Sequence, residues 1–398
     1  MTAASLAKRL FPQETWPCIW IVGGSVRDSL LGKTGEDLDL VAALTPEELT
    51  SRGFRQVDPV SSAPIWFRHI PAIGKIEVTR IDGEGMLRGD LARRDFTVNA
   101  LAMSLDGEVI DLFGGIQDLG RKALRACSPE SFQDDPVRIF RAFRFEADGW
   151  RMECETERMI AEASWEGCFR AIPVERFSRE MVKALAGKEP GLFFRRMMET
   201  GVGGTYLPEL FAMGAVPAGP VERHPEGDLF THALEVMQRT AAAVGDPLAR
   251  FCAFFHDLGK LSTDPALYPA HHGHDKAGRD AAGRFCDGLR LPVSWRRALA
   301  GTCRLHGHAN KWRQLRDSAR ILVAQQALKA GIADILPLIS AADNPHGPGM
   351  SGWDRAVGIA HTKTADLGIE QGCLEVIPAK DRAGFILRKR VEMMRGQS

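Results

Sequence analysis

Residues 21–41 read IVGGSVRDSLLGKTGEDLDLV, and this stretch decides the first part of the fold. The β-branched run before Gly23 predicts a strand, and the segment SVRDSLLG that follows has the apolar spacing of a short helix. We expect a second strand that ends in Asp37-Leu38-Asp39. Residues two apart on a strand project from the same face. The carboxylates of Asp37 and Asp39 would therefore stand side by side, with Leu38 pointing into the core.

Two neighbouring carboxylates repel each other unless a cation offsets their charge. Mg²⁺ prefers carboxylate oxygens, and a pair of such ions can stabilise the attacking and leaving oxygens of phosphoryl transfer. Gly23-Gly24 precedes a helix start, where backbone amides favour phosphate, and Arg27 adds a positive charge. The same residues could form a plain turn with two surface aspartates, but their combined spacing favours the metal site.

The composition is that of a globular protein built from several domains. The 398 residues include 51 basic and 51 acidic side chains, so the charge balance does not favour a protein that coats nucleic acid generally. No apolar run approaches the roughly 20 residues of a membrane span, and the start of the chain lacks a cleavable signal pattern. We therefore expect a cytoplasmic protein without membrane contact.

The pattern of secondary structure changes along the chain. In the first third, short β-branched runs at 18–24, 65–70 and 75–83 predict strands, 99–115 predicts a hairpin, and 45–53 predicts a capped helix. From about residue 131 onward, helix-length amphipathic segments follow one another, interrupted by a Pro- and Gly-rich linker at 214–227. The expected fold class is multidomain, with an α/β part followed by all-α parts.

Four motifs in fixed order give the sequence a family resemblance. They are GGSVRD with DLDL, RRDFTVNALAM from Arg93, DDPVRIFRAFRF from Asp134 and VERFSREMVKAL from Val174. Their order resembles that of the class II nucleotidyltransferases, which include bacterial tRNA CCA-adding enzymes and poly(A) polymerases. The resemblance implies a nucleotidyltransferase-type head with a mixed sheet, followed by a helical neck. It also implies that tRNA, CTP and ATP are partners.

The resemblance further implies roles for individual residues. Asp37 and Asp39 would be catalytic and carry Mg²⁺, and the implied nucleotide contacts are Gly24, Arg27, Arg94 and Asp95. Many family members have Glu-Asp where this chain has Asp134-Asp135, and this departure shortens the first acid.

A second group of residues suits the selection of bases. Asp135 and Arg138 are three apart in a predicted helix and hence on one face. A carboxylate that accepts from an amino group and a guanidinium that donates to a ring nitrogen suit the pairing edges of cytosine and adenine, and misalign with uracil and guanine. Arg141 and Arg144 continue the row and could follow the triphosphate or the primer end. The alternative is a salt bridge between Asp135 and Arg138 on a solvated helix face.

A further constellation lies in the helical part. A His-Asp doublet in the apolar segment RFCAFFHDLGK would be costly to bury without partners. Together with histidines before and after it and a distant aspartate, it resembles the HD-type metal-dependent phosphohydrolases. The resemblance implies metal ligands at His232, His256, Asp257 and Asp343, and further ligands or substrate contacts at His272, His274 and His306. Such nitrogen and carboxylate ligands suit Mn²⁺, Ni²⁺ or Co²⁺.

These observations predict a head at 1–125, a neck at 126–205, an HD domain at 220–345 and a helical tail at 346–398. The expected activity is untemplated addition of C, C and A to tRNA 3′ ends from CTP and ATP with release of pyrophosphate, together with a metal-dependent phosphohydrolase activity. Two alternatives stay open. One is a poly(A) polymerase, or an enzyme that adds only C or only A; the other is an HD phosphohydrolase whose head merely binds RNA. The sequence leaves the oligomeric state undetermined.

Overall fold

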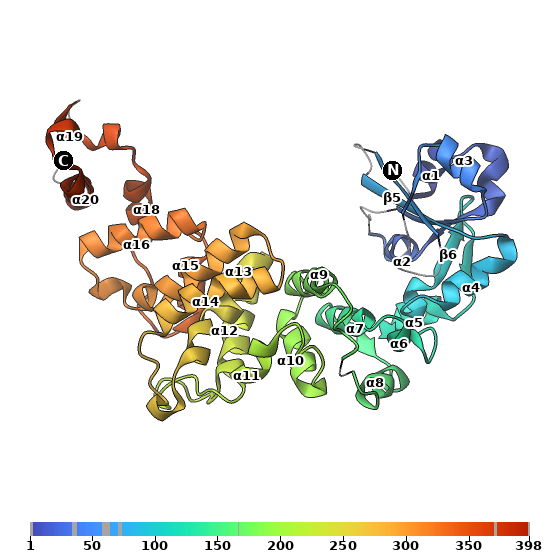
Figure 1. Ribbon diagram of the computed structural model, residues 1–398, viewed down its shortest axis with the longest axis horizontal. Helices are drawn as coiled ribbons and strands as arrows, with labels where there is room; N and C mark the ends of the chain where they lie inside the picture. Colours follow the sequence, from blue (N-terminus) through green and yellow to red (C-terminus); the bar gives the residue numbers. More distant parts are fainter. Residues whose placement is uncertain are drawn as a thin grey trace. The chain divides into compact units, whose positions relative to one another are not determined.

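The computed structural model describes residues 3–33, 38–57, 64–70, 74–165, 167–369 and 372–396. Asp37, one of the two predicted metal ligands of the head, lies outside the described residues. The chain divides into two compact units, Met1–Glu166 and Gly167–Ser398 (Figure 1). Each unit is considered by itself, and the domain limits expected from the sequence stay predictions.

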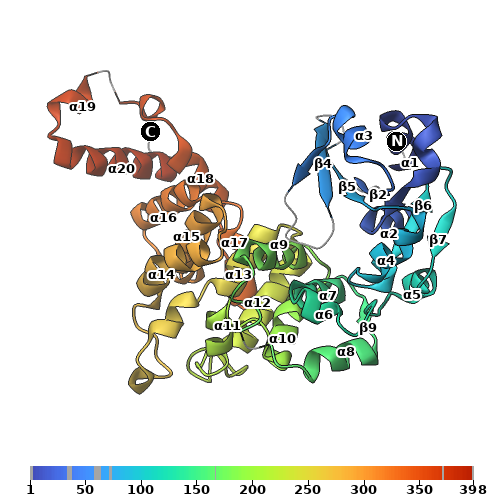
Figure 2. The same ribbon diagram turned by 45° about the vertical axis from the view of Figure 1, so that its right-hand side comes forward.

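Seven of the described strands form one mixed sheet in the first unit, in the order β3-β4-β5-β2-β1-β6-β7 (Figure 2). They are β1 Ile19–Val22, β2 Leu38–Ala42, β3 Arg55–Val57, β4 Ile65–Ile70, β5 Gly74–Arg80, β6 Leu101–Ser104 and β7 Val109–Asp111. Neighbouring strands are antiparallel except β2 and β5, which run parallel. The predicted strands and the hairpin at β6 and β7 are thus confirmed.

Helices cover both faces of this sheet. Strand alternation sends Ile19 and Ile21 of β1 toward a core that also contains residues of α1 and α3. The other β1 side chains, Trp20 and Val22, join a second core with Leu91 of α4. The helices of the unit are α1 Ala3–Leu10, α2 Gly24–Leu30, α3 Pro46–Ser51, α4 Leu87–Ala92, α5 Gly115–Arg121, α6 Ser131–Asp134, α7 Val137–Ala147 and α8 Cys154–Ala161.

The position of the aspartate motif on its strand differs from the prediction. Among the described residues β2 spans Leu38–Ala42, so the strand continues beyond Asp39 and does not end there. The apolar residues that drive strand formation are Leu40, Val41 and Ala42, which follow the motif. Leu38 is 2% exposed, which confirms that it points into the core.

The second unit consists of helices, as the amphipathic segments predict. The α-helices are α9 Val174–Leu185, α10 Pro190–Thr200, α11 Pro208–Met213, α12 Leu229–Ala243, α13 Pro247–Phe255, α14 His274–Gly288, α15 Val293–Asn310, α16 Asp317–Ala330, α17 Leu336–Asp343, α18 Trp353–His361, α19 Cys373–Val376 and α20 Ala379–Arg395. The short 3₁₀ segment η4, Leu258–Ser262, follows α13 and packs on α14. α12 packs on α13 and α17, while α15 packs on α14 and α17. These contacts bring the ends of α13 and α17 together with α12 and α15.

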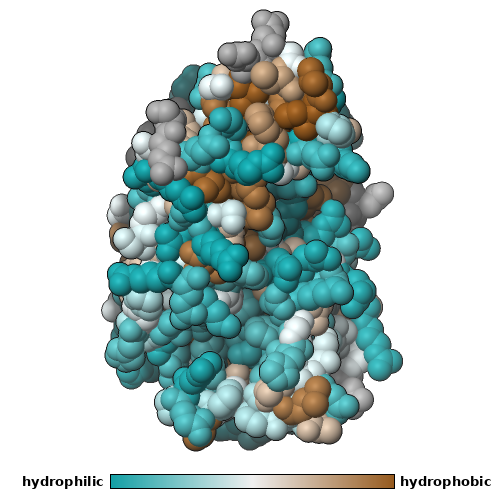
Figure 3. Space-filling model, turned by 90° about the vertical axis from the view of Figure 1, so that its left-hand side faces the viewer, coloured by the Kyte–Doolittle hydropathy of each residue, from teal (hydrophilic) through white to brown (hydrophobic). Residues whose placement is uncertain are grey.

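The surface of the molecule is predominantly polar on the face shown in Figure 3, where hydrophobic side chains gather in separate patches. Among the helices of the described ranges, none combines the length and the apolar character needed to cross a membrane.

Candidate active sites

Asp39 lies on the face of the sheet that α4 covers. Its neighbours Leu38 and Leu40 point into the core beneath α1 and α3, whereas Val41 belongs to the core beneath α4. Strand alternation therefore places the Asp39 side chain on the Val41 face. Asp39 is half-buried, and the hydroxyl oxygen of Ser25 lies 3.5 Å from its backbone nitrogen. The sheet thus presents the Asp39 carboxylate beside the start of α2.

Gly23 leaves space beside the Asp39 carboxylate for the Arg94 guanidinium because it has no side chain. It adopts a positive φ of 71°, which disfavours any residue with a side chain. A Cβ at this position would lie 2.6 Å from Nη1 of Arg94 and 3.8 Å from Oδ2 of Asp39. Arg94 is held by Asp90, whose Oδ2 accepts from Nε at 3.2 Å and from Nη2 at 3.0 Å. A bare backbone, a carboxylate and a guanidinium therefore meet at the turn between β1 and α2.

A hydrogen-bond network connects α2 with α7. Nη1 of Arg27 donates to Oδ1 of Asn99 at 2.6 Å, and Nδ2 of Asn99 donates to Oδ1 of Asp95 at 2.9 Å. The other Asp95 oxygen accepts from Nη1 of Arg141 at 2.8 Å. Burial disfavours a charged Asp95, but Arg141 and the hydrogen bonds from Asn99 and the Phe96 amide outweigh it and lower its pKa from 3.8 to about 2. Asp95 is therefore an ionised, buried link between the two helices.

Asp135 and Arg138 are adjacent, but not as two members of one helix. α6 ends at Asp134 and α7 begins at Val137, so Asp135 precedes the helix that contains Arg138. Nε of Arg138 lies 3.9 Å from Oδ2 of Asp135, while its Nη atoms donate to backbone oxygens of Ser131 and Arg93 and to the Ser131 hydroxyl. Asp135 and Arg138 therefore form a long ion pair, and hydrogen bonds to backbone oxygens hold the Arg138 guanidinium in place.

The remaining predicted head residues lie nearby. The guanidinium of Arg144 is 4.3 Å from the ring centroid of Phe145, and that of Arg27 is 5.1 Å from the same ring. Gly24 is the first residue of α2. Glu77 pairs in register with Asp39 on the neighbouring strand and forms a salt bridge with Lys75 at 2.7 Å. β5 lies inside the sheet between β4 and β2, so this salt bridge is not on an edge strand.

The structure brings the four ligands predicted for the helical unit together. His232 lies in α12, His256 and Asp257 follow α13, and Asp343 ends α17. Oδ1 of Asp343 is 3.1 Å from Nε2 of His232 and 3.5 Å from Nε2 of His256. Oδ2 of Asp257 is 3.2 Å from Nε2 of His256 and 3.7 Å from Nε2 of His232. Two imidazole nitrogens and two carboxylates therefore converge on one small volume.

These groups are buried without adequate partners. His232, His256 and Asp257 are 2%, 1% and 4% exposed. Within the described part of the chain, Nε2 of both histidines and Oδ1 of Asp257 have no hydrogen-bond partner. Burial opposes a charge on His256, but the carboxylates of Asp257 and Asp343 raise its pKa to about 10. Since unpaired buried polar groups are costly, the cluster has the chemistry expected of a cation site.

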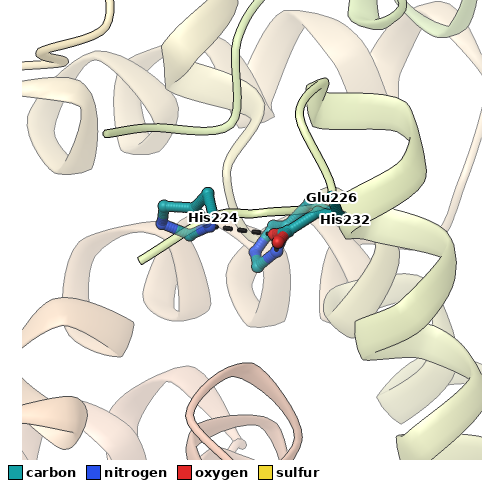
Figure 4. A group of neighbouring side chains, drawn as sticks. All are labelled: His224, Glu226 and His232. Carbon is teal, nitrogen blue, oxygen red and sulfur yellow. Dashed lines mark hydrogen bonds and ion pairs between the residues drawn. The ribbon is translucent and has the colours of Figure 1, made fainter. Parts of the chain in front are cut away.

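Glu226, which the sequence reasoning missed, orients the first of these histidines (Figure 4). Its Oε1 lies 2.6 Å from Nδ1 of His232 and 2.9 Å from Nδ1 of His224. Burial would raise the pKa of Glu226, but the hydrogen bond from His224 and the contacts of His232 lower it. An ionised carboxylate on Nδ1 leaves the Nε2 lone pair of His232 facing the site, an arrangement typical of metal-binding histidines. The only sequence signal was a glutamate six residues before a candidate ligand.

Two more residues escaped the sequence reasoning. Nδ2 of Asn310 donates to Oδ2 of Asp343 at 2.6 Å, which leaves Oδ1 directed at the histidines. Nζ of Lys260 lies 2.6 Å from Oδ2 of Asp257 and donates to the carbonyl oxygen of Ala218 at 2.6 Å. Lys260 sits three residues after the doublet, so a one-turn spacing could have suggested it. Asn310 belongs to a different helix from Asp343, so local pattern offers no signal.

The other three histidines separate into two groups. Nε2 of His274 and of His306 lie 3.3 and 3.2 Å from Oδ1 of Asp257, so both belong to the cluster. His272 is exposed. The cluster depends on a close backbone approach, because a Cβ at Gly259 in η4 would overlap the carbonyl oxygen of His274 and the backbone nitrogen of Gly278. Glycine at that position lets η4 lie directly against α14.

Comparisons with known proteins identify the family of this chain. Residues 19–70 and 72–125 match the poly(A) polymerase head domain. The multifunctional CCA protein of Methylococcus capsulatus is 38% identical over 323 residues, which cover 76% of this chain and 75% of that protein. The corresponding protein of Pasteurella multocida is 36% identical over 323 residues, with 75% and 76% covered. The structure of the Thermotoga maritima CCA-adding enzyme complexed with tRNA has a similar fold, with a TM-score of 0.63, 20% sequence identity, and 100% of this chain and 95% of that chain covered.

The mixed sheet, its strand-borne carboxylate and the family match define the first unit as a nucleotidyltransferase head. Enzymes with such heads normally use a divalent metal ion. The identity to curated relatives extends well beyond the head and into the helical unit. The chain belongs to the multifunctional CCA protein family.

Proposed function

We propose that this chain adds C, C and A to the 3′ end of tRNA from CTP and ATP. The tRNA 3′-hydroxyl oxygen forms a bond to the α-phosphorus, the bond from that phosphorus to the β-phosphate oxygen breaks, and pyrophosphate leaves. One observation carries the proposal: Oδ2 of Asp39 lies beside the bare backbone of Gly23 with Arg94 next to it. The names of the relatives and of solved complexes with tRNA, CTP and ATP support it.

The donor set at this turn fits Mg²⁺. Asp39 offers a half-buried carboxylate, and carboxylate oxygens are the ligands that Mg²⁺ prefers. Asp37 is proposed as the second ligand on the strength of the motif alone. Bound there, Mg²⁺ would stabilise charge on the attacking and leaving oxygens. Arg94 would offer its guanidinium to phosphate oxygens, and Gly24 and Arg27, both in α2, would contact the nucleotide.

The base is proposed to be read by Asp135 and Arg138. The carboxylate would accept from the amino group of cytosine or adenine, and the guanidinium would donate to the ring nitrogen. Bonds from Arg138 to Ser131 and to the Arg93 carbonyl fix the guanidinium in place. A misplaced donor opposite uracil or guanine would leave buried groups unpaired, at a cost of roughly 1 to 3 kcal/mol each. Arg141 and Arg144 would contact the phosphates or the primer end.

The direct test uses a tRNA that lacks its CCA end. The purified chain, Mg²⁺ and this tRNA are incubated with CTP alone, with ATP alone and with both, and the 3′ ends are sequenced. We expect two C residues from CTP alone and CCA from the mixture. Runs of A from ATP would favour a poly(A) polymerase, and single-nucleotide products would favour an enzyme that adds only C or only A. Unextended tRNA in all three reactions would refute the transferase and leave an RNA-binding head.

We infer a second activity, phosphoester hydrolysis, for the helical unit. The buried cluster of His232, His256, Asp257 and Asp343 supports this function, since imidazole nitrogens combined with carboxylates fit Ni²⁺, Mn²⁺ or Co²⁺. Such an ion lowers the pKa of a bound water and makes hydroxide available near neutral pH. Glu226 orients His232, and Asn310 orients Asp343, so both ligand atoms are in place before a cation binds.

Hydrolysis is tested with bis(p-nitrophenyl) phosphate and p-nitrophenyl phosphate as probes of diesterase and monoesterase activity. We expect release of nitrophenol by metal-loaded protein, and its loss in His256→Gln. Asp39→Asn serves as the matched control, because it removes a carboxylate from the other unit and leaves the histidine cluster unchanged. Absence of hydrolysis of both probes with Ni²⁺, Mn²⁺ and Co²⁺ alike would contradict the proposal.

A further inference from the structure

The ring of Phe145 in α7 lies beside two arginines that are proposed to contact the nucleotide or the primer end. The guanidinium carbon of Arg144, the preceding residue of α7, is 4.3 Å from the ring centroid, and that of Arg27 in α2 is 5.1 Å from it. Both distances fall within the roughly 6 Å over which the face of an aromatic ring attracts a cation. One neutral side chain therefore contacts two cations that come from distant parts of the sequence.

Aromatic neighbours hold this ring in one orientation. Phe145 is 3% exposed. Its ring meets that of Phe96 with centroids 5.9 Å apart and planes at 86°, and that of Trp150 with centroids 5.3 Å apart and planes at 73°. Near-perpendicular contacts of this kind are favoured by the electrostatics of aromatic rings. The Phe145 ring cannot turn without losing both contacts, so its electron-rich faces keep a fixed direction.

Arg27 keeps part of its hydrogen-bonding capacity for a ligand. Its Nε and Nη2 donate to the Asp28 carboxylate at 2.9 and 3.0 Å, and its Nη1 donates to Oδ1 of Asn99 at 2.6 Å. Among the described residues these bonds engage three of the five guanidinium N–H groups, which leaves two for phosphate oxygens. A second carboxylate would occupy those groups and neutralise the charge. An aromatic face attracts the cation but carries no net charge, so it leaves the positive charge in place.

Burial strengthens the attraction between the ring and the two cations. The side chain of Arg27 is 15% exposed, and Arg144 is half-buried. A cation–π contact is stronger where water is excluded. Two guanidinium groups beside one ring also repel each other, and this repulsion rises in a medium of low dielectric constant. The ring offsets part of the repulsion, and the negative charge of a bound triphosphate would offset it further.

We propose that Phe145 is a positioning residue of the transferase site, whose ring holds the guanidinium groups of Arg27 and Arg144 in place for the triphosphate of CTP or ATP. This inference rests on the proposed transferase function and deepens it, because it assigns the arrangement of two phosphate contacts to an uncharged, buried residue. A pair of cations that is already in place costs less to order when the nucleotide binds. The role depends on the electron density of the ring face, whereas a packing role depends only on the shape of the ring.

The test changes the electron density of the ring with little change in its shape. In the full-length chain, Phe145 is replaced by phenylalanine analogues that carry one, two and three ring fluorines, which progressively weaken the negative face. CTP binding is measured by isothermal titration with Ca²⁺ in place of Mg²⁺, so the measurement does not require turnover. We expect the CTP affinity to fall with each fluorine, by about tenfold in total, because both cation–π contacts weaken. Far-UV circular dichroism and the thermal midpoint should stay unchanged.

Phe132 provides a matched control for the fluorinated analogues. It is fully buried, and its ring lies beside those of Phe96 and Trp165, with centroids 6.3 and 6.5 Å away. In the described part of the chain no arginine or lysine forms a cation–π contact with it. The same analogues at position 132 should therefore leave the CTP affinity unchanged.

A second background separates the two cations. Arg144→Gln removes one of them from the ring, so only Arg27 should still respond to fluorination. Across the Phe145 analogues the loss of CTP affinity should then shrink from about tenfold to about threefold. A loss that stays at tenfold would show that Arg144 does not depend on the ring and would overturn its part in the proposal.

The outcomes distinguish the role of Phe145 from the transferase function. Normal CCA addition to tRNA, combined with equal CTP affinity for all Phe145 analogues, would overturn the role of the ring and leave the transferase intact. Equal losses for the analogues at positions 145 and 132 would show that packing alone is responsible. A stepwise loss of CTP affinity in a chain that leaves tRNA unextended would support the ring contacts and refute the transferase. Absence of CTP binding by the unchanged chain would overturn both.

Discussion

The two candidate sites of this chain satisfy their charges in opposite ways. In the head, Arg27, Asn99, Asp95 and Arg141 form a chain in which each group has its partner within the protein. In the helical unit, the Nε2 atoms of His232 and His256 and Oδ1 of Asp257 are buried and lack hydrogen bonds among the described residues. Under the proposed functions, the nucleotide site of the head rests on a framework whose groups pair with one another, whereas the proposed cation ligands of the helical unit would gain their missing partner from the cation.

The largest effect that separates the two sites is expected from Asp39→Asn. Loss of the carboxylate should lower incorporation of CTP and ATP into tRNA about a thousandfold or more, because roughly 4 kcal/mol of charge stabilisation is lost. Release of nitrophenol from bis(p-nitrophenyl) phosphate should be unchanged. The control is Asp82→Asn, because Asp82 is exposed and follows the last residue of β5 by two positions. This variant should retain both activities. Parallel loss of both activities would contradict the separation of the two sites.

Glu226→Gln tests whether cation binding depends on the residues that form hydrogen bonds with the proposed ligands. The neutral amide should orient His232 less firmly and weaken Ni²⁺ or Co²⁺ binding roughly 10- to 100-fold, as is usual for such supporting carboxylates. Isothermal titration of metal-free protein measures this change. Glu222→Gln, at an exposed position four residues earlier, should leave the affinity unchanged. Equal affinities for Glu226→Gln and the unchanged chain would show that Glu226 does not position His232.

The pH dependence of the head framework follows from Asp95. Its folded-state pKa of about 2 lies below the ordinary value of 3.8, so its ionised form stabilises the fold. This contribution, about 2 kcal/mol, is complete above roughly pH 4 and is lost as the pH falls through 2. Asp95→Asn should therefore lower the urea midpoint of the affected transition at pH 6 and have a smaller effect at pH 3. A constant difference between these pH values would contradict the proposed ionisation.

The smallest effect is expected from Asn99→Ala, which interrupts the framework without removing a charge. Arg27 and Asp95 would each lose one hydrogen bond, worth roughly 1 kcal/mol. We expect kcat/KM for CTP to fall about tenfold, because Arg27 would be less well positioned. Gln117→Ala, an exposed amide on α5, is the control. An unchanged kcat/KM would show that Arg27 keeps its position without Asn99.

The sequence predicted those features that depend on local pattern. Thr45 caps α3 as the sequence predicts, in a capping box with Glu48, and β1, β4 and β5 appear where β-branched runs occur. The motif residues His232, His256, Asp257 and Asp343 converge as the HD resemblance implied. Such signals are contained within a few residues of each element or in a motif of fixed order.

Features that depend on distant partners were not predictable in the same way. Asn310 fixes Asp343 from another helix, and the contact exists only because α15 packs on α17. β2 continues beyond the motif to Ala42 because the apolar residues after Asp39 pair with β1 and β5. Aromatic contacts between distant segments belong to the same class: Trp312 is fully buried against Trp353, and Trp295 packs on Phe251.

The contact between η4 and α14 at Gly259 limits the width of the histidine-aspartate cluster. Any side chain there would act as a wedge between the His256-Asp257 corner and His274. The span between the two halves of the ligand set is therefore limited by backbone against backbone, which yields less readily than side chains do. Discrimination between ions of different radius would then be a property of the main chain, and an enlarged residue at 259 would shift the preference toward larger cations.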